Sequence, residues 1–441
     1  MRLKFLAALL AISCGVYAQP KVTPLNKPKA ENIYDIKNLF LQQELHNPAD
    51  RDEDGDDNDL TRFNRWFNMM EPRTYPDGNM PRPDALLEAS LQMNAASKAA
   101  KKTTGTNTWN LVGPTIVPTN FNGIGRINCI VLAPQDTSTI FVGSACGGVW
   151  VSHDGGTSWV SNADNFPSLS VADIAVNPKH IDTIYAATGD GYGYENGSYQ
   201  IFWGGLYSAG VMMSTDTGHT WATTGLSYLQ SNNDMIQKLL IHPRRTNILM
   251  AATRNGLMRS TDAGATWANV AGGHIYSLAF HPYNPDTVYA IDSANLIISY
   301  NAGATWAIRY AGINLSDRST LGVSKASPSS VWVLNNSNNV LRSYNYGHTF
   351  TPTSTSPSTL AAFYGYYDRV LAISPTDSNT IYAFGKNMTR SVNNGVNWTV
   401  IDNSHKVHVD YHVATVNPLR DQTIYSGDDG GISVSYNGGS S

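Results

Sequence analysis

One eight-residue pattern recurs along the chain and restricts it to a repeat fold. The pattern is S-x-[DN]-x-G-x-[TS]-[WF], and we call each copy a box. Successive boxes are about 40 to 60 residues apart, a spacing typical of stacked supersecondary units. The last copy stops short of its aromatic residue. The boxes begin at Ser152, Ser214, Ser260, Ser299, Ser343, Ser391 and Ser435.

The residues around each box indicate four short strands per repeat. An apolar run ends near a proline, and a polar turn leads into a strand of the T-I-Y-A type. A third strand ends at the box serine, and a fourth begins with the box tryptophan. Gly, Pro, Asn and Asp bound these runs. Seven such units suit a β-propeller, which closes radially and leaves only short edges. The sequence therefore predicts an all-β, seven-bladed propeller over residues 106–441.

Each box position has a structural explanation. The third residue, Asp or Asn, is expected to accept a backbone N–H two residues further on, in an Asx-turn. The glycine suits a positive φ, and the aromatic residue would bury apolar surface between blades. Asn keeps the turn but not the charge, so the boxes are expected to be structural rather than catalytic. Asn replaces Asp at Asn301, Asn345, Asn393 and Asn437.

The two ends of the repeat region complement each other. The chain stops inside the seventh box, whereas Thr108–Val112 resembles a box end followed by a fourth strand. We expect this N-terminal strand to close the ring against the last blade. A natural chain that continues into further domains is an alternative explanation, and both can hold.

The region before the propeller has a different character. Residues 1–18 have the basic start, apolar stretch and small-residue end of a signal peptide, which predicts a secreted or bacterial cell-surface protein. Residues 19–105 are expected to form an acidic leader, irregular and partly helical, with a helix-like stretch at 84–101. The acidic run 50–59 is interpreted as a solvated linker rather than a calcium loop, since Thr61 stands where a bidentate Glu is needed.

Charge and composition exclude two classes of partner. The 441 residues include 30 basic and 34 acidic side chains, for a net charge of −4. Without a basic stripe, nucleic acid binding is not expected. After the signal peptide no apolar run reaches the length of a membrane span. Cys129 and Cys146 lie on adjacent predicted strands, and both a disulfide and two free thiols fit the sequence.

The boxes resemble the bacterial neuraminidase repeat, or Asp-box, of sialidases, sortilin-like propellers and tandem-propeller xyloglucanases. The resemblance covers about three quarters of the chain and is specific for fold, because the box occurs in enzymes and receptors alike. The chain looks most similar to secreted sortilin-like propeller proteins of Bacteroidota, which commonly carry a C-terminal type IX secretion sorting domain. The matching segments are Arg65–Gly78, Gly125–Ile127, Gly147–Trp150, Thr188–Gly191, His408–His412 and Asp429–Gly431.

The enzyme families that share the box are matched incompletely. Sialidases use an arginine triad, and Arg126-Ile127-Asn128 resembles their R-I-P element without its proline. Tandem xyloglucanases have an Asp before a V-G-G strand, and Ala145 stands at that position here. Those xyloglucanases work in a cleft between two propellers, whereas one is expected in this chain. The resemblance thus disfavours both hydrolase activities.

Candidate site residues gather on the face expected to carry the 2–3 and 4–1 connections of the blades. Positions eight and six before each proline would share a strand face and ring the axis. They hold Arg126 and Asn128, Gln237 (six before only), His274 and Tyr276, Tyr367 and Arg369, and Asp410 and His412. The 2–3 loops add Asp190, Asp428 and Asp429.

The second blade carries an aromatic insertion in its 2–3 loop, at 191–210. Its rings suit stacking on sugars or on a protein partner, although a flap packed on its own blade fits as well. The insertion contains Tyr192, Tyr194, Tyr199, Phe202, Trp203 and Tyr207.

His408, Asp410 and His412 alternate, and on a strand they would project to one side. Imidazole and carboxylate donors in that arrangement suit a divalent cation, the one cofactor the sequence suggests. The other interpretation is a polar ring hydrogen-bonded to Arg126 or Arg369 and to water. Asp410 with Asp428 or Asp429 is the best candidate acid–base pair.

Two functional hypotheses follow. The leading one is a binding module for extracellular polysaccharide or protein. Its candidate ligand-binding residues are Tyr199, Trp203, Tyr207, His274, Tyr276, Tyr367, Arg369 and Asp190. The alternative is a glycoside hydrolase, sialidase-like or xyloglucanase-like, or a polysaccharide lyase. Its candidate catalytic residues are Asp410, His412, Asp428, Asp429 and Arg126.

Overall fold

The computed structural model describes residues 32–46, 59–74, 76–79, 92, 125–161, 169–191, 208–228, 234–311, 319–335, 337, 339–353, 368–401, 407–420 and 422–440. Two compact units can be separated, Met1–Arg82 and Pro83–Ser441. Each is described by itself.

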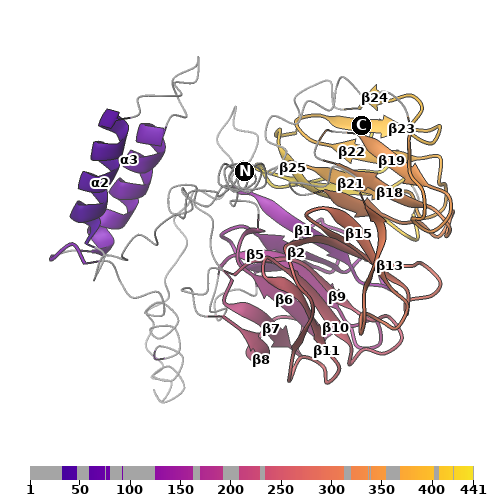
Figure 1. Cartoon of the computed structure of the whole chain (residues 1–441), viewed down its shortest axis with the longest axis horizontal. Coiled ribbons are helices and arrows are strands. Elements are labelled where there is room, and N and C mark those ends of the chain that lie inside the picture. Colours follow the sequence, from indigo (N-terminus) through magenta and orange to yellow (C-terminus); the bar gives the residue numbers. More distant parts are fainter. Residues whose placement is uncertain are drawn as a thin grey trace, which may run out of the picture. The chain divides into compact units, whose positions relative to one another are not determined.

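The described strands of the second unit form seven antiparallel sheets, six of four strands and one of three, each in chain order (Figure 1). The first four sheets contain β1 (Ile127–Leu132), β2 (Ile140–Ser144), β3 (Val149–Ser152), β4 (Val160–Ser161), β5 (Val171–Val176), β6 (Ile184–Thr188), β7 (Gly210–Ser214), β8 (Ala222–Ser227), β9 (Ile236–Ile241), β10 (Leu249–Thr253), β11 (Gly256–Ser260), β12 (Ala268–Ala271), β13 (Ile275–Phe280), β14 (Val288–Asp292), β15 (Asn295–Ser299) and β16 (Ala307–Ala311). The last three contain β17 (Thr320–Gly322), β18 (Val331–Leu334), β19 (Val340–Ser343), β20 (Thr351–Pro352), β21 (Val370–Ile373), β22 (Ile381–Phe384), β23 (Met388–Ser391), β24 (Thr399–Val400), β25 (Tyr411–Val416), β26 (Ile424–Asp428) and β27 (Ile432–Ser435).

The seven sheets close into a ring. Each innermost strand packs against the innermost strand of the next sheet, and β25 returns to pack against β1. Across that junction the Thr415 hydroxyl donates to the Ile130 carbonyl at 3.0 Å, and the Tyr425 hydroxyl donates to the Gly155 carbonyl at 3.3 Å. The predicted seven-bladed propeller is confirmed. The strand expected to complete the last blade, Thr108–Val112, lies outside the described residues.

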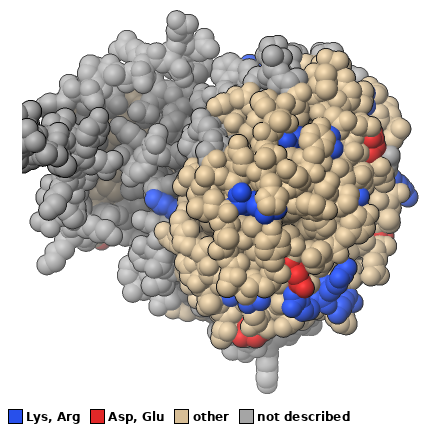
Figure 2. Space-filling model, turned by 45° about the vertical axis from the view of Figure 1, so that its right-hand side comes forward, with Lys and Arg blue, Asp and Glu red and all other residues tan. Residues whose placement is uncertain are grey.

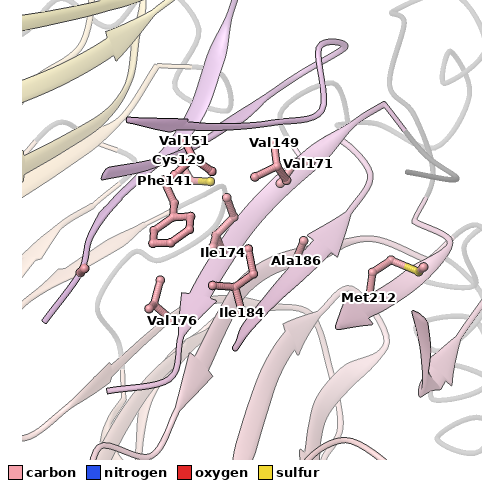
Figure 3. Close-up of a cluster of buried hydrophobic side chains, with 11 residues drawn as sticks. Cys129, Phe141, Val149, Val151, Val171, Ile174, Val176, Ile184, Ala186 and Met212 are labelled. Atoms are coloured by element: carbon pink, nitrogen blue, oxygen red, sulfur yellow. The ribbon is translucent and has the colours of Figure 1, made fainter. Parts of the chain in front are cut away.

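The core consists of apolar clusters between neighbouring blades. In the first, Phe141 of β2 faces Ile174 of β5 and Ile184 of β6, and all three are buried (Figure 3). In six of the seven clusters the box tryptophan or phenylalanine of the following blade packs against the cluster, as Trp221 does here and Trp267 in the next. The expectation that the box aromatic residues bury surface between blades is confirmed.

The box is held by a fixed set of hydrogen bonds, shown by the copy at Ser260. The serine hydroxyl donates to Asp262 Oδ1 at 2.8 Å and accepts the Gly264 N–H at 2.9 Å. Asp262 Oδ1 accepts the N–H of Thr266 at 2.9 Å. The aspartate thus bonds the fourth residue on, which corrects the expected Asx-turn to the second residue. The glycine has φ +89°, as expected.

The residue before each box glycine has a left-handed backbone conformation and connects the box to another part of the same blade. Ala263 has φ +58° although it is not glycine. Its N–H donates to the Asn247 carbonyl in the turn between the first two strands of its own blade, at 2.9 Å. Its carbonyl accepts the hydroxyl of Tyr185 from the preceding blade at 3.1 Å. All seven boxes have a positive φ at this position and the same backbone bond to the 1–2 turn. The box and that turn therefore share one face, which we call the box face.

Removing the box hydroxyl should destabilise the propeller. Ser260→Ala leaves the buried Gly264 N–H without an acceptor, so the free energy of unfolding should fall by about 1–3 kcal/mol. Asp262→Asn should have a much smaller effect, because Asn301 and Asn345 make the same bonds in other boxes. Urea denaturation followed by tryptophan fluorescence measures both. Equal losses in the two variants would contradict this account of the box.

The first unit contains a helical pair that the sequence interpretation missed. Helices α2 (Ile33–His46) and α3 (Asp59–Met70) pack together, and the 3-10 turn η1 (Glu71–Arg73) follows. Phe40 stacks on Phe63 with ring centroids 4.1 Å apart. The signal was present in α3, where aromatic residues recur at i, i+3 and i+4. Apart from Gln92 and Asp59, the helix-like stretch predicted at 84–101 and the acidic run 50–59 lie outside the described residues, as does the signal peptide.

Two further expectations can be compared with the structure. Cys129 and Cys146 are both free, the first buried and the second exposed, so the disulfide alternative is wrong. No helix in the described part of the chain is long and apolar enough to cross a membrane. On the face in view in Figure 2, the described surface shows only scattered basic and acidic side chains.

Candidate functional site

One face of the ring brings together the start of each inner strand and the loop after each second strand. The antiparallel register sets this placement, since Ile127 pairs with Ser144 and Tyr411 pairs with Asp428. This face of the ring and the box face are at opposite ends of the strands. We call it the inner-strand face, and the expectation that it carries the 2–3 loops and the starts of the inner strands is confirmed.

A β-bulge recurs at the start of the inner strand in five blades. The register shifts there, and one residue of the inner strand is skipped in the sequence of paired positions. Bulges redirect side chains and are common beside functional sites. The bulges fall at position six before the proline, so the regular alternation expected along the inner strand is interrupted there, although Arg126 and Asn128 still both reach Asp190 and His274 still stacks on Tyr276. The bulged residues are Asn128, Ala172, Gln237, Tyr276 and His412.

Arg126 and Asp190 join the first two blades on this face. Arg126 lies just before β1, and its guanidinium forms an ion pair with Asp190 in the loop after β6. The bulged Asn128 donates to the Val171 carbonyl at 3.0 Å and contacts Asp190 Oδ1 at 3.4 Å. Asp190 is 3% exposed. Two predicted site residues are thus brought together, in a contact that also connects two blades.

Blade seven holds a cluster of acids around a buried histidine. His412 Nε2 lies 2.8 Å from Asp429 Oδ1, and the histidine side chain is fully buried. The neighbouring Asp428 is 2% exposed and accepts the N–H groups of Gly430 and Gly431 through Oδ1, at 2.7 and 3.0 Å. Its Oδ2 has no hydrogen-bond partner among the described residues. Burial raises the pKa of Asp428 to about 7.

Asp410 belongs to the same cluster. Burial, followed by the nearby charge of Asp429, raises its pKa, whereas His408 and Lys386 lower it. Two carboxyl groups that both sense Asp429 and His408, those of Asp410 and Asp428, therefore hold protons to higher pH than usual. Such groups can donate a hydrogen bond to a ligand oxygen or exchange a proton with it.

The predicted metal site does not form as expected. Strand β25 begins at Tyr411, so His408 and Asp410 precede it, and Asp410 has φ +67°. The three side chains therefore do not alternate along one strand. No group of three or more His, Cys, Asp or Glu residues within the described ranges is placed to hold a metal ion.

Blade four adds an aromatic pair. His274 stacks on the bulged Tyr276 with ring centroids 4.0 Å apart, at the start of β13. Burial, aided by Arg254, lowers the pKa of His274 to about 4, so the ring is neutral at physiological pH. In blade six, Arg369 is buried just before β21.

Several predicted ligand-binding residues fall outside the described part of the chain. They are Tyr199, Trp203 and Tyr207 of the aromatic insertion, and Tyr367.

The structure also adds groups that the sequence interpretation did not include. Asp173 is buried beneath β9, where it accepts the Leu239 N–H at 2.7 Å and lies 3.1 Å from Lys238 Nζ. Lys386, between β22 and β23, acts on Asp410 across the boundary between blades six and seven. No sequence signal marks these contacts, because they join different repeats.

The raised pKa of Asp428 should make stability depend on pH. Between about pH 4 and 7 the folded state binds more protons than the unfolded chain, so stability falls as pH rises through this window. Asp428→Asn keeps an acceptor for Gly430 and Gly431 but removes the titration. The variant should gain stability relative to wild type from about pH 4 to pH 7, by at most about 1.4 kcal/mol per pH unit, and the gain should level off above pH 7.

Urea denaturation at pH 5, 6, 7 and 8 measures this difference. Asp182→Asn is the control, since that exposed carboxylate lies in a turn on the box face. Parallel curves for wild type and Asp428→Asn would show that Asp428 titrates normally.

Comparison with known proteins gives the fold and no family. No protein-family model matches the chain, and no curated protein matches it in sequence. A GH74 xyloglucanase from Xanthomonas campestris is similar, with 17% identity and a TM-score of 0.57 over 73% of this chain and 53% of that chain. A GH74 enzyme from Niastella koreensis has 17% identity and a TM-score of 0.55, over 72% and 53%.

The extracellular domain of BT4673 from B. thetaiotaomicron is also similar, with 12% identity and a TM-score of 0.51 over 70% of this chain and 38% of that chain. The chain spans about half the length of the GH74 structures it matches. At these identities the likeness establishes a propeller fold shared with glycoside hydrolases and an extracellular domain.

Proposed function

We propose that this chain is an extracellular propeller that binds glycan through its inner-strand face. The observation that carries the proposal is the blade-seven cluster, where Asp410 and Asp428 both have raised pKa values beside the His412–Asp429 pair. Perturbed carboxyl groups gathered at one place are more common in functional sites than elsewhere. A protonated carboxyl donates to sugar oxygens, and an ionised one accepts from sugar hydroxyls.

Other groups on the same face support a glycan ligand. The His274–Tyr276 stack supplies ring surface, and Tyr276 stays partly exposed. The likeness to GH74 enzymes and to an extracellular domain agrees with secretion, which the N-terminal sequence predicts. The same face could instead bind a protein, and the glycan assay described below distinguishes a glycan ligand from a protein ligand.

The second candidate function is hydrolysis or lyase cleavage of a polysaccharide at the same cluster. Asp428 favours it, because a carboxyl with a pKa of about 7 suits general acid–base catalysis near neutral pH. Ala145 disfavours a xyloglucanase-like mechanism. It is 5% exposed, and it stands where the resemblance places that family's acid.

The deciding experiment measures binding and cleavage in the same samples. The purified protein is incubated with plant, algal and host glycans, with and without EDTA, and both retention on the glycan and released sugar are measured. We expect retention without release. Asp429→Asn and Tyr276→Ala should each weaken retention about tenfold, corresponding to about 1.4 kcal/mol.

Tyr436→Ala is the control, since this exposed tyrosine belongs to the seventh box on the opposite face. Sugar release that Asp410→Ala abolishes would replace the binding proposal with a hydrolase or lyase, and loss with EDTA would add a metal. If the protein is not retained on any glycan and releases no sugar, both proposals are overturned, and a protein ligand is the explanation that remains.

A further inference from the structure

On the box face, an arginine from the preceding blade reaches each of the last four boxes. The contact is made with the residue before the box glycine. Arg259 Nε, for example, donates to the Ala302 carbonyl of box four at 2.8 Å, and Arg390 Nη1 donates to the Gly438 carbonyl of box seven at 2.5 Å. In the order of the boxes that they reach, the arginines are Arg259, Arg309, Arg342 and Arg390.

The same four boxes have asparagine in place of aspartate at their third position. The turn does not require the exchange, because Asn301 Oδ1 accepts the Thr305 N–H at 2.9 Å just as Asp262 Oδ1 accepts that of Thr266. The exchange does remove a charge. Hydrogen bonds from Thr266 lower the pKa of Asp262 to about 2, so its carboxylate is ionised at physiological pH. Boxes one and three keep aspartate, and a tyrosine hydroxyl rather than an arginine reaches them.

The arginines and the asparagines together leave positive charge without a counter-charge. None of the four arginines forms an ion pair with a carboxylate in the described part of the chain. Asp286, in the 1–2 turn of blade four, pairs with Arg245 instead. An aspartate in the box would offset a guanidinium bonded to the next residue. Asparagine at that place therefore leaves a positive potential that favours an anionic ligand.

Exposed tyrosine rings lie on the same surface. Tyr300 and Tyr344, the second residues of boxes four and five, are each 61% exposed. The guanidinium carbon of Arg342 lies 4.3 Å from the centre of the Tyr344 ring, and Tyr300 shares a hollow with Tyr346. The second residues of boxes one to three are His153, Thr215 and Thr261.

The spacing of these rings favours a sugar polymer over a folded protein. Polar box residues such as Ser299, Asn301 and Thr305 separate one ring from the next. A protein interface has a closely packed apolar core, whereas single rings with a polar surround suit stacking on individual sugar units. The repeated placement of a ring and a cation in successive boxes also matches a ligand made of repeating units.

We propose that boxes four to six form a binding strip for an anionic polysaccharide. The charge of the four arginines attracts its carboxylate or sulfate groups, and its sugar rings stack on Tyr300 and Tyr344. Arginine suits such a ligand because it forms charge-assisted hydrogen bonds with oxyanions. The strip lies on the box face, so it is separate from the inner-strand face and does not depend on the function proposed there.

The test compares binding of the full chain to alginate, dextran sulfate and uncharged dextran by biolayer interferometry at low and high salt. Alginate carries carboxylates, and dextran sulfate carries sulfates on the dextran backbone, so the set separates the two anions from the sugar chain. At least one anionic polymer should bind about tenfold or more tightly than dextran, and salt should weaken that binding. Polyglutamate, which has the charge without the sugar, should bind about tenfold more weakly than that polymer.

Restoring the missing box charges should remove binding. Asn301→Asp, Asn345→Asp and Asn393→Asp, combined in one chain, should weaken binding to the anionic polymer about tenfold or more. The fold should be kept, since Asp262 makes the same bonds in its own box. An unchanged urea midpoint checks this.

The matched control makes the opposite exchange in the other three boxes, with Asp154→Asn, Asp216→Asn and Asp262→Asn combined. It changes the same number of charges away from the strip, so affinity should stay within about threefold of wild type. Tyr300→Ser with Tyr344→Ser should weaken binding several-fold. Leu169→Ser, which alters a residue 55% exposed just before β5, should not.

Four results would overturn the proposal: no binding of either anionic polymer, equal binding of dextran, equal binding of polyglutamate, or equal and opposite shifts in the two triple variants. The last result would show a response to net charge alone. Asp429→Asn should leave binding to the strip unchanged, and the asparagine-to-aspartate variant should leave retention of neutral glycans unchanged. Failure of the inner-strand function is therefore distinguishable from failure of this one.

Discussion

The propeller depends on the left-handed residue that precedes each box glycine. Its N–H bonds the 1–2 turn of the same blade, and in several blades its carbonyl accepts a side chain from the preceding one. Ala263 and Tyr346 adopt this conformation although they are not glycine, at φ +58° and +59°. A conformation that costs about 1–2 kcal/mol per residue persists because bonds on both sides hold it. The box thus stabilises each blade through the N–H of this residue. In several blades it also joins the blade to the preceding one through the carbonyl of the same residue.

Because the box face is formed by the same contacts in every blade, the residues at the inner-strand face can differ between blades. At the inner-strand face the repeated bulges interrupt the ladder without breaking the ring, and each blade carries a different residue there. The outcome differs between blades: a charged contact at Arg126 and Asp190, a ring stack at His274, and an acid cluster around His412. Function on a propeller resides in such differences between repeats rather than in the repeats themselves.

The features that could be predicted from the sequence are those whose interacting residues lie close together along the chain. The box was readable because Ser260, Asp262 and Gly264 bond one another within five residues. The bulges could not be predicted in this way, because the bulge at Tyr276 is defined only by the register with the partner strand β14. The helical pair in the first unit was readable from its aromatic spacing but was missed, since the surrounding acidic and polar segments masked the pattern.

The sequence by itself determined the number of blades, the strand order and the structural role of the boxes, because local hydrogen bonds and period-two strands set these. Only the tertiary structure decided which buried groups are satisfied. Tyr185 and Tyr289 occupy equivalent positions, yet one hydroxyl is bonded and the other has no hydrogen-bond partner among the described residues. Asp428 likewise has a raised pKa because of what surrounds it. For Tyr185 the partner is Ala263 of the next blade, so that contact forms only when neighbouring blades pack together in the ring.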